Sequence, residues 1–174
     1  MLKQISMACG IALVSLAASA QMPVPLLDGS VSAQARKQLE GVLLCKKGTT
    51  FTAKTVEAQL ESLGLAKGAG GIFLPARAGT KAVLFDDEVI AALVSDADGE
   101  KKISVYLKKK NAKQLAKQFG VSQVDEQANT DDESYFKQNG NKNTLMVGAE
   151  YELDIGNTGQ RIKYKSSVTC QVIQ

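Results

Sequence analysis

The chain contains two copies of one pattern, in which a short amphipathic helix closed by glycine precedes four segments of strand length. The copies span about residues 55–108 and 111–172. In the first helix Val56, Leu60 and Leu63 recur at a helical spacing that places them on one face. The sequence therefore predicts an α+β fold in which a tandem α-β4 repeat forms an antiparallel sheet, with the helices packed on one face of it.

Turn residues separate the expected strands of each copy. These strands are 72–76, 82–85, 89–95 and 101–108 in the first copy, and 134–138, 144–147, 150–155 and 161–172 in the second. The pair Asp98-Gly99 is a strong signal for a two-residue hairpin. Residues 123–133 are polar and acidic, and we expect them to form a mobile loop.

Charge predicts the register of the last hairpin. If Ile155 pairs with Gln160, three acidic side chains face three basic ones: Asp154 with Arg161, Glu152 with Lys163, and Glu150 with Lys165. The other face of the same hairpin has a core pattern, with Tyr151, Leu153 and Ile155 against Ile162, Tyr164, Val168 and Cys170.

The N-terminus has the pattern of a secretory signal. A basic start precedes the apolar run 5–18, and small residues then allow cleavage between Ala20 and Gln21. The alternative is an uncleaved membrane anchor, but the apolar run is shorter than the roughly 20 residues that span a bilayer. We expect a signal peptide over 1–20, an extended lead-in over 21–31, and a single α+β domain over 32–174 that begins with a helix. The mature protein is expected to be soluble in the periplasm or secreted.

Two cysteines remain after removal of the signal, because Cys9 leaves with it. In an oxidising compartment we expect Cys45 and Cys170 to form a disulfide that joins helix to sheet. The alternative is a pair of free buried thiols. A closed zinc site is excluded, since two cysteines without histidine supply too few ligands.

Several kinds of chemistry are missing from the chain. It contains no histidine, which excludes the histidine-dependent catalytic triads and zinc sites. The SxxK spacing of Ser134 and Lys137 falls in an expected strand, where the two side chains would lie on opposite faces. The acidic segment 96–100 lacks the glycine and glutamate positions of a calcium loop. We therefore expect no catalytic residue, no metal and no cofactor.

The near balance of charge limits the partners. Removal of Lys3 leaves 20 basic side chains against 18 acidic ones, which is too small an excess to favour nucleic acid or an anionic membrane. A protein partner is the remaining expectation.

The first copy is expected to expose an apolar strip on the outer face of its sheet. With Asp98-Gly99 as the turn, Ile90, Ala92 and Val94 face the core. The outer face then carries Val89, Ala91, Leu93, Ser104 and Tyr106. An exposed apolar face of a sheet is usually covered or used for binding, so these five residues are the candidate partner-binding site.

The order of helix and four antiparallel strands, repeated across most of the mature chain, resembles the β-lactamase inhibitory protein architecture. That family has a disulfide within each copy, whereas one disulfide here is expected to span both. The resemblance implies inhibition of a secreted enzyme through the open face of the sheet. Small exported immunity proteins, which neutralise toxins in the bacterial envelope, are similar in size and character.

Three functions follow from the sequence. The first is a periplasmic inhibitor or immunity-type protein, not an enzyme, that binds another protein across the strip. The second is an envelope scaffold or assembly factor that uses the same face for docking or homodimerisation. The third is a histidine-free hydrolase of cell-wall material.

Overall fold

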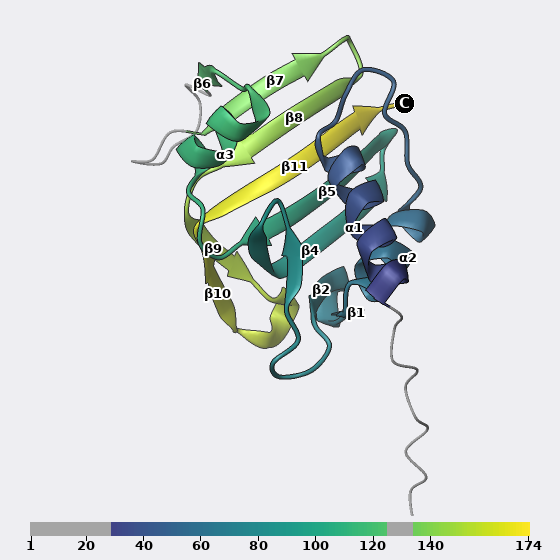
Figure 1. The fold of residues 1–174 in the computed structure, drawn as a ribbon, viewed down its shortest axis with the longest axis vertical. Helices are drawn as coiled ribbons and strands as arrows, with labels where there is room; N and C mark the ends of the chain where they lie inside the picture. The colour runs from purple at the N-terminus through teal and green to yellow at the C-terminus, as the bar shows by residue number, and fades with distance from the viewer. Residues whose placement is uncertain (1–28, 125–133) are drawn as a thin grey trace, which may run out of the picture.

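The computed structural model of the chain describes residues 29–124 and 134–174, which form three α-helices and antiparallel strands (Figure 1). The α+β class is confirmed. Helix α1 spans Gly29–Leu43, so residues 29–31, which we expected in the lead-in, are helical. The signal peptide with its cleavage site, the rest of the lead-in and most of the expected loop 123–133 lie outside the described residues.

The two shorter helices begin at side chains that accept backbone hydrogen bonds. In α2 (Ala53–Ser62) the hydroxyl of Thr52 accepts a bond from the backbone N–H of Thr55. Helix α3 (Ala112–Phe119) begins with a reciprocal capping box between Asn111 and Gln114. It ends at Gly120, whose φ of 65° suits a residue without a side chain. These caps define where α2 and α3 begin and where α3 ends.

Nine strands form one antiparallel sheet in the order β1-β2-β4-β5-β11-β8-β7-β6, with β3 paired beside β2 on β4. Their bounds are β1 Leu65–Lys67, β2 Ile72–Pro75, β3 Ala82–Leu84, β4 Asp87–Ala97, β5 Glu100–Leu107, β6 Gln123–Val124, β7 Tyr135–Asn139, β8 Asn143–Gly148 and β11 Ser166–Ile173. Strands β9 (Tyr151–Asp154) and β10 (Arg161–Tyr164) form a separate hairpin. Short 3-10 helices lie at Ala69–Gly71 (η1) and Gly156–Thr158 (η2).

The expected strand 161–172 is divided in two. At Lys165 the chain leaves the hairpin, where its backbone N–H donates to the carbonyl oxygen of Leu107 at 2.8 Å. The hydroxyl of Ser166 then donates to the carbonyl oxygen of Lys110 at 2.6 Å. Strand β11 continues between β5 and β8, so the core pattern expected across this hairpin as far as Val168 and Cys170 is wrong.

The predicted registers of two hairpins are confirmed. Asp98 and Gly99 connect β4 to β5, both at positive φ, and Ala97 pairs with Glu100. In the β9–β10 hairpin Asp154 pairs with Arg161 and Glu152 with Lys163. Ion pairs join Arg161 to Asp154 at 2.9 Å, Lys163 to Glu152 at 3.6 Å, and Lys165 to Glu150.

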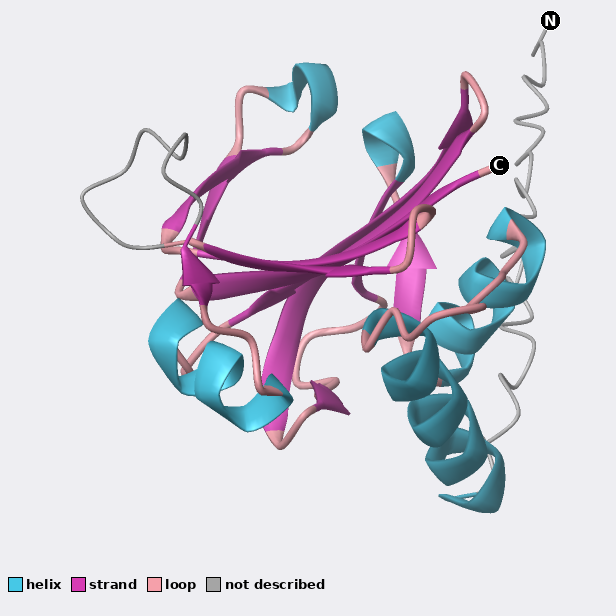
Figure 2. Cartoon of the chain, turned by 90° about the horizontal axis from the view of Figure 1, so that it is seen from above, coloured by secondary structure: helices cyan, strands magenta, loops and turns pink. Residues whose placement is uncertain are grey.

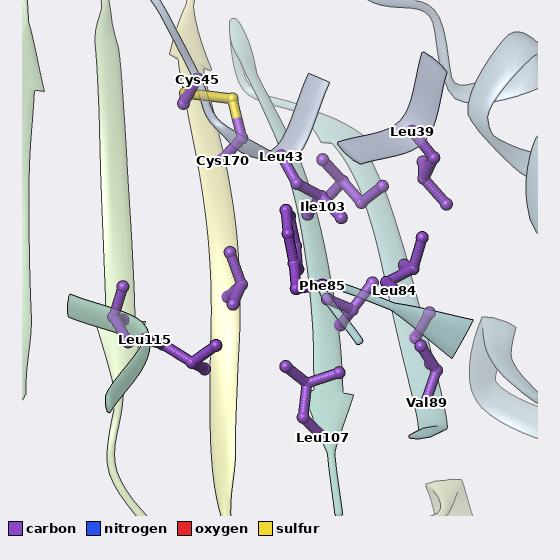
Figure 3. Packing of buried hydrophobic residues seen from close by; sticks show 14 of the residues in the cluster. Leu39, Leu43, Cys45, Leu84, Phe85, Val89, Ile103, Leu107, Leu115 and Cys170 are labelled. Atoms are coloured by element: carbon purple, nitrogen blue, oxygen red, sulfur yellow. A yellow bond between two sulfur atoms is a disulfide. The ribbon is translucent and has the colours of Figure 1, made fainter. Parts of the chain in front are cut away.

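All three α-helices lie on one face of the sheet, which Figure 2 shows edge-on. The main core fills the space between them and includes Leu39 and Leu43 from α1, Ile103 and Leu107 from β5, and Leu115 from α3, each fully buried (Figure 3). The disulfide between Cys45 and Cys170 is present, and it ties the end of α1 to β11. No helix among the described residues is long and apolar enough to cross a membrane.

Candidate functional site

The strip predicted from the sequence is divided between the two faces of the sheet. A β-bulge between Val89 and Ala91 shifts the pairing of β4 with β5. Because of the extra residue, Val89 lies opposite Leu107, and its side chain is buried in the main core on the helix side. The prediction that Val89 faces outward is therefore wrong, and Ile90, expected to face the core, takes the irregular position in the bulge.

The outer part of the strip is largely covered by the chain itself. The β9–β10 hairpin folds over this face, and Leu153, Ile155 and Ile162 pack there. They form a second, smaller core with residues of the main sheet: Ile72, Leu74, Ala91, Leu93 and Tyr106. Ala91 is fully buried, whereas Leu93 and Tyr106 remain half-buried. The apolar surface expected to receive a partner thus serves first to hold the hairpin.

Ser104 lies on the same outer face but is also withdrawn from solvent. It pairs with Thr169 of β11 in the register of the sheet, and the two hydroxyl groups are 2.8 Å apart. Both side chains are buried. Each hydroxyl satisfies the other, so this pair stabilises the junction of β5 and β11.

Tyr106 belongs to a cluster of three tyrosines at the open end of the hairpin, a group that we call the tyrosine cluster. The ring centroids of Tyr106 and Tyr164 are 4.9 Å apart. Tyr151 pairs directly with Tyr164 across the hairpin and is 65% exposed, which makes it the most exposed large hydrophobic side chain of the described residues. Sequence patterning placed Tyr151 and Tyr164 on a core face, which is wrong for the exposed Tyr151. The contact of Tyr164 with Tyr106 depends on how the hairpin folds back.

Burial raises the pKa values of the two half-buried tyrosines of the cluster, Tyr106 and Tyr164. Burial raises the pKa of Tyr164 to about 12, with smaller contributions from Tyr106 and Tyr151. Burial also raises the pKa of Tyr106, although a hydrogen bond with Ser104 opposes the shift. The shifts move the pKa values of Tyr106 and Tyr164 further from neutral pH, so both phenols keep the proton that lets them donate hydrogen bonds.

The other motifs considered in the sequence have structural roles. Ser134 accepts a hydrogen bond from the backbone N–H of Ala149 at 3.3 Å, and Lys137 lies exposed on β7. The acidic segment 96–100 forms the β4–β5 turn. Within residues 29–124 and 134–174 no group of three or more potential ligand side chains could hold a metal ion.

Comparison with known proteins found no matching family model, no similar curated protein and no similar solved structure.

Proposed function

We propose that this chain is an exported protein of the inhibitor or immunity type, which binds another protein through the tyrosine cluster. The observation that carries the proposal is the 65% exposure of Tyr151 beside two half-buried tyrosine rings. Tyrosine is enriched at protein interfaces because a rigid ring supplies contact area while its hydroxyl group can pair with a partner. The exposed residue that we propose for binding thus lies at the edge of the predicted strip and not within it.

The surroundings of the tyrosine cluster favour a partner surface of low net charge. On the opposite face of the hairpin, Glu150, Glu152 and Asp154 are all in ion pairs with Arg161, Lys163 or Lys165. These ion pairs leave little net charge around the tyrosine cluster. A polar ring around aromatic anchor residues is typical of protein interfaces. The protonated phenols would donate to carbonyl or carboxylate oxygens of the partner.

The disulfide supports placement of the protein in an oxidising compartment such as the periplasm. Disulfides persist in exported proteins and are rare in the reducing cytosol. The link between Cys45 and Cys170 agrees with the signal expected over residues 1–20, and a partner would then be an envelope enzyme or a secreted toxin.

We also propose that the sheet derives from two related α-β4 units. The strand order supports this, since β1, β2, β4 and β5 run inward from one edge and β6, β7, β8 and β11 run inward from the other. Helix α2 precedes the first set and α3 the second. In this proposal the β9–β10 hairpin is an addition to the second unit.

Site-specific photo-cross-linking tests the binding site. A benzophenone amino acid at position 151 should cross-link one envelope protein in cells that express the chain. The matched control is position 173, because Ile173 is also an exposed apolar residue, 48% accessible, but lies at the far end of β11. Identical products at both positions, or none at 151, would contradict the assignment.

The purified pair then tests affinity and inhibition. Replacement Y151D should weaken binding at least tenfold, because an anchor is replaced by a charge that must lose water. I173D should leave affinity and folding unchanged. A cross-link from 151 to a second copy of the same chain, with a dimer mass by light scattering, would instead support the scaffold function.

A further inference from the structure

Two adjoining hollows open on the helix side of the sheet, beside the N-terminus of α2. The larger has a volume of about 380 Å³ and the smaller about 220 Å³. They share three lining residues, Thr50, Phe51 and Lys101, and so form one continuous depression. It lies away from the tyrosine cluster, because its walls come from residues 48–59 and from the opposite ends of the central strands.

Two lysines give the smaller hollow a positive charge. Lys101 and Lys142 both line it, and none of the ion pairs within the described part of the chain includes either one. No aspartate or glutamate side chain lines either hollow, and Gln174, the last residue of the sequence, lines the smaller one without an ion pair to either lysine. Asp96 is the cross-strand neighbour of Lys101 but makes no ion pair with it. The two ammonium groups are therefore available to an anion.

The floor of the depression is apolar. Phe51 is 8% exposed and lies beneath both hollows, Val42 and Val56 line the larger one, and Val172 lines the smaller one. Apolar side chains with a few polar groups placed around them are typical of sites for small organic ligands. The volumes are at the lower end of such sites, which limits the ligand to a small molecule.

A polar atom without a partner lies at the other end. The side-chain oxygen Oε1 of Gln59 is buried and accepts no hydrogen bond, although its Nε2 donates to Gln38 at 3.2 Å. Gln59 lines the larger hollow. A buried acceptor that lacks a partner is costly, and a donor on a ligand would satisfy it once the Gln59 side chain turns its oxygen toward the hollow.

The wall of the depression is fixed before any ligand arrives. The side-chain amide of Asn139 donates to the carbonyl oxygen of Cys45 at 2.9 Å, and that of Asn143 donates to Thr49 at 2.8 Å. With the disulfide, these bonds hold the segment between α1 and α2 against the β7–β8 hairpin. A fixed wall lowers the entropic cost of binding.

We propose that the depression binds a small amphipathic carboxylate that carries a hydroxyl or N–H donor at its far end. The carboxylate lies between Lys101 and Lys142, the apolar body covers Phe51, and the donor reaches the Oε1 atom of Gln59. This site is independent of the proposed function, since it shares no residue with the tyrosine cluster.

Three related compounds test the proposal by NMR titration of the whole protein. The first is 3-(4-hydroxyphenyl)propanoate, which has all three features; 3-phenylpropanoate lacks the donor and 3-(4-hydroxyphenyl)propanamide lacks the charge. We expect saturable shifts of the Thr50, Phe51 and Lys101 amides with the first compound. Affinity should fall about tenfold for each of the other two. Equal responses to the carboxylate and the amide, or no saturable shift, would overturn the proposal.

Variants identify the groups that bind. K101M with K142M should abolish binding, whereas K113M with K117M removes the same charge from the exposed face of α3 and should not. Q59L should bind the hydroxylated and unhydroxylated acids equally. It also removes the hydrogen bond from Nε2 to Gln38, but that pair is exposed, so the variant should remain folded. Unchanged affinity in the K101M, K142M protein would refute the site even if wild type binds.

Discussion

The buried carboxylate of Asp87 holds together two segments that are distant in sequence. It is 2% exposed, and it accepts hydrogen bonds from the backbone N–H groups of Glu88, Lys109 and Lys110. Glu88 is the second residue of β4, and the two lysines lie between β5 and α3. A carboxylate that accepts several backbone donors fixes both segments and satisfies groups that would otherwise lack partners.

Replacement D87A should lower the free energy of unfolding by about 2–4 kcal/mol, because it leaves three backbone donors without their acceptor. The matched control is D96A, since Asp96 is exposed on the same strand, and its effect should stay within about 0.5 kcal/mol. Urea unfolding measures both. A loss for D87A no larger than that for D96A would show that water replaces the carboxylate at little cost.

The turn beside Asp87 shows what the sequence does not reveal about single residues. The expected strands 82–85 and 89–95 placed the break after residue 85, yet Phe85 and Asp86 occupy the turn at positive φ. Phenylalanine is unfavourable at such a position. It is held there by long-range contacts: its ring lies 4.8 Å from that of Phe119, and its N–H donates to Glu40 at 2.7 Å. No local signal encodes those partners.

For the β9–β10 hairpin, the sequence predicts the register of the strands but not the position of the hairpin in the fold. Its register follows from alternating charges and is confirmed, because opposite charges must face each other within a few residues. Its position depends on Leu153, Ile155 and Ile162 finding an apolar surface on strands far away in sequence. The predicted strip included that apolar surface, but the sequence did not show that the hairpin covers it. The bulge beside Ile90 was also not predictable, because no glycine or other local signal marks it.

Replacement I155A should detach the hairpin in part. Ile155 is 6% exposed in the second core, so its truncation should cost about 2–4 kcal/mol of unfolding free energy and increase binding of a dye specific for apolar surface. Y151A lies in the same hairpin but is exposed, and its cost should stay below about 1 kcal/mol. Equal costs, with no gain in dye binding, would mean that the hairpin is held by its ion pairs and not by the second core.

At the scale of the whole molecule, one covalent bond joins the helix layer to the centre of the sheet. Cys45 lies two residues after the end of α1, and Cys170 lies in β11 between β5 and β8. Both cysteines are fully buried. This connection was predictable because two cysteines remain outside the expected signal and the elements that carry them faced each other in the expected layers.

The double replacement C45A, C170A should lower the free energy of unfolding by about 5 kcal/mol, the value that chain entropy gives for a loop of this separation. Urea unfolding of the variant and the oxidised wild type measures the difference. Addition of a reductant should weaken the wild type and leave the variant unchanged. A wild type that remains equally stable after verified reduction would show that packing, not the bond, determines the stability.

The place of β11 in the sheet sets an order of events for a chain that emerges from its N-terminus. β11 follows every other described strand in sequence, yet it lies between β5 and β8 and pairs with both. Until it arrives, each of these two strands has an unpaired edge, and the two halves of the sheet cannot join. A newly made chain thus passes through a stage in which two strand edges are open to pairing with other chains, and the insertion of its last described strand ends that stage.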